Sequence, residues 1–92
     1  MRFKDLKFGE LFDGVQAIVG YGDYELSIIK HSSSYGGKQG LYEIAVFFQG
    51  EQHELSGVTE EGDTIKGFLT IEEVDGIMLK MMSLTGETGL QV

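Results

Sequence analysis

Apolar and polar residues alternate along two neighbouring stretches of the chain, residues 24–31 and 41–48. In the first stretch Tyr24, Leu26 and Ile28 fall on one face, as the two-residue period of a strand requires. The second stretch is apolar on both faces for most of its length, which is typical of a central strand. Because a polar, glycine-rich loop joins the two stretches, the pattern predicts an antiparallel hairpin.

Other stretches have weaker strand patterns. Residues 15–19 predict a short strand that ends in a turn, residues 64–69 alternate, and residues 53–55 predict the beginning of a further strand. The first stretch of the chain, residues 1–14, places aromatic and leucine side chains among charges and is interrupted by Gly9. It predicts either a short helix or an extended N-terminal arm that packs its aromatic side chains on the domain.

The clearest local pattern is the start of a helix. Thr70 lies three residues before Glu73, which is the spacing of a capping box, where each side chain accepts from the other residue's backbone N–H. Apolar residues then recur at helical spacing, namely Ile71, Val74, Met78, Met81 and Met82. A glycine at position 86 or 89 is a suitable end. The pattern therefore predicts a C-terminal helix over residues 71–84.

The order of these elements predicts an α+β fold, a small antiparallel sheet of three or four strands with one C-terminal helix packed on a face. A chain of 92 residues has the length of a single domain, residues 1–92, and shows no linker or internal repeat. A core of this size is marginal, so we expect nearly all the inward-facing apolar residues to be used for packing.

Composition narrows the class of protein. The chain carries 15 acidic and 7 basic side chains, a net charge of −8, which opposes direct binding to nucleic-acid phosphates. It has no cysteine, which excludes disulfides and thiolate metal sites. No apolar stretch approaches the roughly 18 residues of a membrane span or resembles the core of a signal peptide. We therefore expect a soluble intracellular protein that does not bind membranes.

The negative charge is concentrated in one part of the chain. Residues 43–75 contain nine acidic residues and one base, Lys66, and so hold the whole net charge of −8. Part of this group, Glu72, Glu73 and Asp75, suits the positive end of the helix dipole. The other acids either keep a small domain soluble or form a contact for a basic partner. The candidate protein-binding residues are the acids on predicted turns: Glu51, Glu54, Glu60, Glu61 and Asp63.

Other residue clusters give little support for catalysis or metal binding. His31 and His53 are the only imidazoles, and their spacing matches no metal-binding pattern. Three serines, residues 32–34, lie beside His31, but adjacent serines in a glycine-rich loop are typical of turns. Lys38 follows two glycines yet leads into a strand, unlike the lysine of a phosphate-binding loop. We therefore predict no catalytic residue, no metal and no cofactor.

Three stretches, residues 24–29, 34–46 and 62–70, resemble small, uncharacterised proteins encoded by bacteriophages and prophages. The resemblance carries no catalytic motif. It implies expression in the cytoplasm of a bacterial host cell and action by binding a host factor. Small acidic phage proteins of this kind include inhibitors that imitate DNA.

The sequence therefore predicts a non-enzymatic, phage-type accessory protein that binds a host or viral protein with a basic surface. One form of this hypothesis is an inhibitor with a DNA-like acidic face. The alternative is an assembly module that forms a homodimer or larger homo-oligomer through strand edges or through the Met-rich helix, if that face is exposed. A third hypothesis is a small enzyme or ligand-binding protein that uses the loop of residues 31–40. A concave site around His31, Tyr35 and Lys38 would favour the third.

Overall fold

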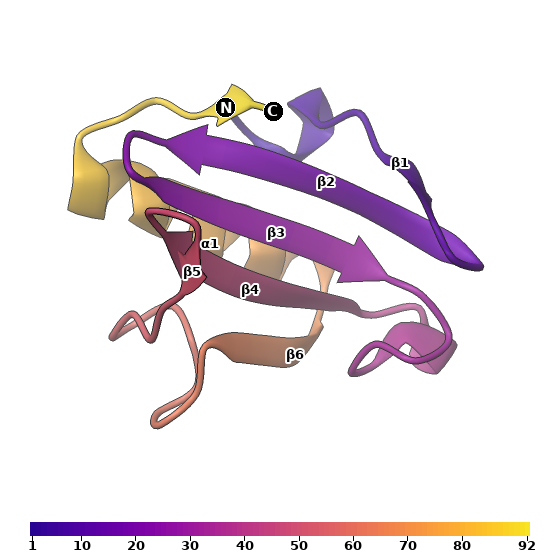
Figure 1. Ribbon diagram of the computed structural model, residues 1–92. Coiled ribbons are helices and arrows are strands. Elements are labelled where there is room, and N and C mark those ends of the chain that lie inside the picture. Colours follow the sequence, from indigo (N-terminus) through magenta and orange to yellow (C-terminus); the bar gives the residue numbers. More distant parts are fainter.

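The computed structural model describes residues 1–92 and has an α+β fold, with one antiparallel sheet of seven strands and one C-terminal helix (Figure 1). The helix, α1, spans Ile71–Thr85, and two short 3₁₀ helices lie at Phe3–Asp5 and Gly37–Gln39. The predicted class is therefore confirmed, but the sheet has more than the expected three or four strands. The strands are β1 (Gly9–Leu11), β2 (Gly14–Tyr21), β3 (Tyr24–Lys30), β4 (Tyr42–Phe48), β5 (Glu51–Gln52), β6 (Ile65–Leu69) and β7 (Leu90–Gln91).

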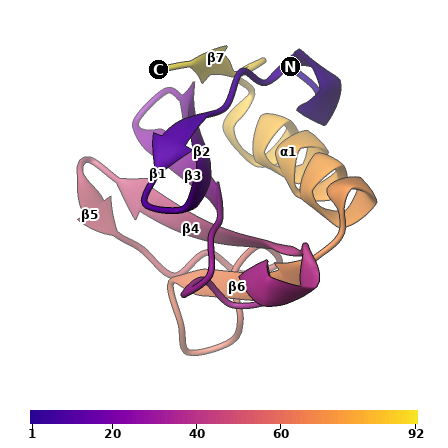
Figure 2. The same ribbon diagram turned by 90° about the vertical axis from the view of Figure 1, so that its right-hand side faces the viewer.

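Three long strands form the middle of the sheet. β2 pairs with β3, and β3 pairs with β4, in a register that places Ala17 opposite Ile28 and Ile28 opposite Ile44. Each outer edge of this meander is covered by two short strands (Figure 2). β1 and β7 pair with β2, while β5 and β6 pair with β4. β1, β5 and β7 contain only two or three residues, too few to show an alternating pattern, so the sequence predicted fewer strands.

The predicted beginning of a strand at residues 53–55 is wrong. The strand in this region is β5, which ends at Gln52, and residues 53–55 have no regular structure. The ring of His53 packs instead on Tyr24 and Phe48, with centroid separations of 5.8 and 5.4 Å. This ring packing and one backbone hydrogen bond to β4, from the His53 N–H to the Val46 carbonyl at 3.0 Å, together position the start of this segment.

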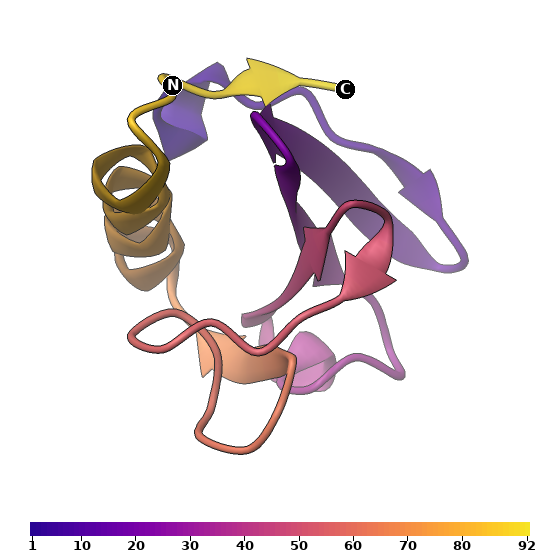
Figure 3. The same cartoon turned by 60° about the vertical axis from the view of Figure 1, so that its left-hand side comes forward.

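The N-terminal residues form an extended arm with one 3₁₀ turn. Figure 3 shows this arm at one end of the core, between α1 and β2. Phe3 and Phe8 pack on the ring of Tyr42, with centroids 5.4 and 5.8 Å away. Gly9 begins β1. The arm thus covers part of the core and belongs to the folded domain.

The helix begins where the sequence predicts and ends one residue later. Thr70 Oγ1 accepts from the N–H of Glu73 at 3.2 Å, and the Glu73 carboxylate accepts from the N–H of Thr70 at 2.9 Å, so the capping box is formed. Gly86 ends the helix in the left-handed conformation with φ of 73°, and its N–H donates to the carbonyl of Met82. Glycine adopts this conformation without the steric cost that other residues incur.

The core lies between α1 and one face of the sheet. Alternate residues of the three long strands point toward the helix, as the period of a strand requires. The side chains in this core that are completely buried are Val19, Tyr21, Leu26, Ile28, Ile44, Val46, Val58, Val74, Met78 and Met81. The other face of the sheet turns away from the helix (Figure 3).

Candidate functional site

The five predicted binding residues lie on the segment that connects β4 to β6. We call residues 51–63 the acidic loop; it includes β5 and then extends to β6 (Figure 1). Val58 is only 1% exposed and belongs to the hydrophobic core. Thr59 is also buried, and its Oγ1 accepts from the N–H of Leu55 at 3.0 Å. The acidic loop is therefore anchored in the domain.

Two side-chain hydrogen bonds connect the beginning of the acidic loop with its end. The carboxylate of Glu54 accepts from the N–H of Gly62 at 2.6 Å. The hydroxyl of Thr64 donates to Gln52 Oε1 at 2.8 Å. Glu51 lies on β5 itself. The other predicted residues are brought together around the turn that the Glu54 bond closes: Glu54, Glu60, Glu61 and Asp63.

No carboxylate of the acidic loop forms an ion pair. All five carboxylates are exposed, and the one ion pair of the molecule joins Arg2 and Asp75. Two lysines lie near the loop: Lys66 lines a hollow with Glu60 and Asp63, and the ammonium of Lys80 lies beside Gly57. Lys66 also contributes, after the hydrogen bonds with the backbone and side chain of Thr70, to lowering the pKa of Glu73. With five exposed carboxylates against these two lysines, the loop presents an excess of negative charge to solvent.

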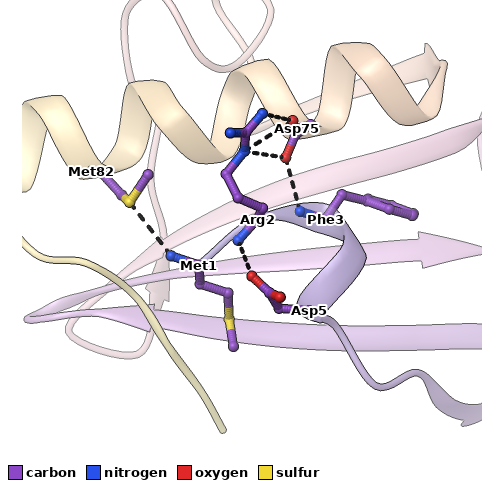
Figure 4. A network of polar contacts seen from close by, with 6 residues as sticks. All are labelled: Met1, Arg2, Phe3, Asp5, Asp75 and Met82. Carbon is purple, nitrogen blue, oxygen red and sulfur yellow. Dashed lines mark hydrogen bonds and ion pairs between the residues drawn. The ribbon is translucent and has the colours of Figure 1, made fainter.

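Asp75 does not share the role of the loop acids. Its carboxylate accepts from the guanidinium of Arg2, with an Nε–Oδ1 distance of 3.0 Å, and from the N–H of Phe3 at 2.9 Å (Figure 4). The Arg2 hydrogen bond and, next, the Phe3 hydrogen bond lower the pKa of Asp75 to about 2. This carboxylate connects the N-terminal arm to α1 and is not available to a partner.

The loop after β3 is organised by local hydrogen bonds. The buried Ser34 Oγ accepts from the N–H of His31 at 2.9 Å and donates to the His31 carbonyl at 2.8 Å. The N–H of Ser33 donates to Nδ1 of His31 at 3.1 Å, so the backbone occupies that nitrogen. A hollow of about 230 Å³ includes Tyr35 and Lys38 but not His31. The structure thus does not bring His31, Tyr35 and Lys38 into one concave site.

One of the two surfaces named for self-association, the Met-rich stripe, is occupied within the molecule. Met78 and Met81 are completely buried, and Met82 packs against the core, so the Met-rich stripe is core packing. Short strands cover the edges of β2 and β4, so the free strand edges of the sheet are those of β1, β5, β6 and β7, each of which pairs with one strand only. The apolar residues that α1 exposes are Ile71, Leu79 and Leu84, and among them Ile71, the first residue of the helix, was expected on the buried stripe.

The sequence did not identify the helix-free side of the sheet as a candidate surface. We call this side the open face. The sequence did contain a signal for this surface, because residues 41–48 are apolar on both faces of the predicted strand. The structure confirms that β4 is central, yet no helix covers its second apolar face. The open face is formed by the residues that alternate with the core positions of the long strands: Gln16, Ile18, Glu25, Ser27, Ile29, Glu43, Ala45 and Phe47.

No group of three or more His, Asp or Glu side chains is arranged to hold a metal ion. α1 is not long and apolar enough to cross a membrane. Comparisons of the chain with protein-family models, with curated proteins and with solved structures give no match. The resemblance to phage and prophage proteins therefore stays a prediction, and function has to be inferred from the geometry and charge of this chain.

Proposed function

We propose that this chain is a non-enzymatic, phage-type accessory protein that binds a host or viral protein with a basic surface, in the cytoplasm of a bacterial cell. The acidic loop carries this proposal, because it combines five exposed carboxylates with the absence of any ion-pair partner. Since the core anchors the loop, little conformational entropy is lost when a partner binds. Its charge accelerates association with a basic surface and makes it sensitive to salt.

The loop carboxylates divide into two groups. Glu54 and Asp63 each accept a backbone N–H, from Gly62 and Thr64 respectively, both at 2.6 Å, and so maintain the loop conformation. The remaining three make no hydrogen bond within the molecule and supply the charge that a partner meets: Glu51, Glu60 and Glu61. A partner that normally binds nucleic acid through the same basic surface would be inhibited by this contact.

Neutralising those three carboxylates tests the proposal. The variant Glu51→Gln, Glu60→Gln, Glu61→Gln removes three charges and keeps the hydrogen bonds that close the loop. With the immobilised protein in bacterial lysate at low salt, we expect the wild type to retain proteins that high salt releases. We expect the triple variant to lose them, as mass spectrometry of the eluates will show.

The matched control removes the same number of charges from exposed positions outside the loop: Glu10→Gln, Glu72→Gln and Glu87→Gln. It should retain the same proteins as the wild type, since the loop is intact. Equal retention by all three proteins, or retention that high salt leaves unchanged, would contradict the proposal.

A further inference from the structure

The open face is apolar in its middle and carries no basic residue. The register places Ile18 opposite Ser27, and Ser27 opposite Ala45. Glu25 lies opposite Phe47 on the neighbouring strand. Apolar side chains therefore adjoin a carboxylate on this surface, and no helix packs over them. Ile18, Ala45 and Phe47 are only partly exposed, and partly exposed apolar surface with polar residues beside it suits an interaction site.

A hollow of about 260 Å³ lies in the open face, between Ile18 on β2 and Phe47 on β4. Two polar side chains also line it: Ser27 is 7% exposed, and Gln16 Nε2 donates to Ser27 Oγ at 3.1 Å. The hollow is smaller than the roughly 300–1,000 Å³ of sites for drug-sized ligands. Its dimensions therefore suit one side chain of a partner better than a cofactor.

The carboxylate of Glu25 also lines this hollow. It is half-buried and has no ion-pair partner, since the one ion pair joins Arg2 and Asp75. A lysine or arginine side chain combines the two properties that this site offers to a ligand. Its methylene stem packs on apolar side chains, and its cation pairs with a carboxylate.

We propose that the open face binds a basic, apolar segment of a partner protein, with one lysine or arginine of that segment seated between Ile18 and Phe47 and its cation on Glu25. The choice of a basic segment as the ligand rests on the proposed function, since the acidic loop and the open face would both bind a basic partner. The open face adds a second contact site to the acidic loop. The segment that it binds has apolar residues on both sides of one cation.

Charge argues against other occupants. A second copy of the chain would bring another net charge of −8 and would place Glu25 against Glu25. A nucleic acid would meet the same negative charge. A basic segment meets attraction from Glu25 instead, so electrostatic complementarity selects it.

Peptide titration followed by NMR of the ¹⁵N-labelled protein tests this site. The probe is a blocked leucine–lysine–leucine tripeptide, and the control peptide has norleucine in place of lysine. We expect the lysine peptide to shift the amide signals of Ile18, Ser27, Phe47 and Gly50, the residues around the hollow. The norleucine peptide should shift them much less, because it lacks the cation.

Two variants separate the open face from the acidic loop. Glu25→Gln should weaken binding of the lysine peptide by about two- to fivefold, the range of a partly exposed ion pair. Glu61→Gln, which removes one charge from the acidic loop, should leave shifts on the open face nearly unchanged.

Each other outcome has a definite meaning. Shifts confined to residues 51–63 would overturn the open-face site and leave the proposed function standing. Equal binding of the norleucine peptide would overturn the open-face site for a cation and indicate purely apolar contact. Shifts on this face that depend on protein concentration without peptide would also overturn it and indicate self-association. If a lysine-rich peptide shifts neither region, the proposed function fails as well.

Discussion

Tyr21 is the largest completely buried side chain of the core, and its hydroxyl has no hydrogen-bond partner. The backbone of Gly89 closes over the ring: a Cβ added there would lie 2.9 Å from Tyr21 Cε1. A buried polar group without a partner costs roughly 1–3 kcal/mol of stability. The ring therefore stabilises the fold while its hydroxyl destabilises it.

We expect Tyr21→Phe to raise the free energy of unfolding by about 1 kcal/mol, because the substitution removes the unpartnered hydroxyl and keeps the ring. Urea unfolding at neutral pH measures the change. Tyr24→Phe is the control, since Tyr24 is only half-buried and should change little. A less stable Tyr21→Phe variant would show that the hydroxyl has a partner in solution.

The same hydroxyl makes stability depend on alkaline pH. Burial raises the pKa of Tyr21 to about 12 in the folded state, from 10.0 for an ordinary tyrosine. The unfolded chain therefore loses this proton first, so the contribution of Tyr21 is complete below about pH 10 and is lost as the pH rises toward 12. We expect a loss of about 2 kcal/mol over this range. Urea unfolding of the wild type and of Tyr21→Phe at each pH measures this effect. The variant should lack the fall in unfolding free energy that the Tyr21 hydroxyl causes between about pH 10 and 12.

At the scale of elements, the start of α1 depends on one side chain. Thr70→Ala removes the acceptor of the Glu73 N–H and should lower the free energy of unfolding by about 1 kcal/mol. Thr70→Ser keeps the hydroxyl and should retain most of the stability. Thermal unfolding followed by circular dichroism compares the two, and equal melting temperatures would contradict a role for the cap.

Elements that depend on neighbouring residues could be predicted from the sequence, and elements that depend on distant residues could not. The capping box requires only Thr70 and Glu73, and the β3–β4 hairpin requires only alternation. β7, in contrast, exists because Leu90 pairs with Gly20, which nothing near residue 90 indicates. Likewise, nothing near residues 53–55 indicates that pairing with β4 ends at the His53 N–H, where the ring packs on Tyr24 and Phe48.

The same distinction applies to the candidate site. Counting charges located the acidic segment, because charge is a property of composition. It could not tell Glu54, whose carboxylate holds Gly62, from Glu61, which stays free, since that depends on the turn the loop adopts. It also assigned Asp75 to the helix dipole, whereas the carboxylate pairs with Arg2.

At the scale of the whole molecule, Asp75 connects the arm to the helix, and its carboxylate gives stability a dependence on acid pH. Its pKa is lowered from 3.8 to about 2 in the folded state, so its contribution is present above pH 3.8 and lost as the pH falls through 2. We expect Asp75→Asn to lower the melting temperature by a few degrees at neutral pH, and to lower it less in acid. Asp23→Asn, on an exposed turn, is the control; an equal effect of both would contradict this role.

Contacts of the N-terminal arm join distant parts of the chain and so affect the order of folding. The bond from Arg2 to Asp75 spans 73 positions, and the bond from the Lys7 N–H to Gln91 spans 84. Closing such long loops costs more entropy than pairing β2, β3 and β4 in succession. We therefore expect the meander to form in the transition state and the arm to dock after it. Stopped-flow kinetics should show Asp75→Asn accelerating unfolding while the folding rate changes little.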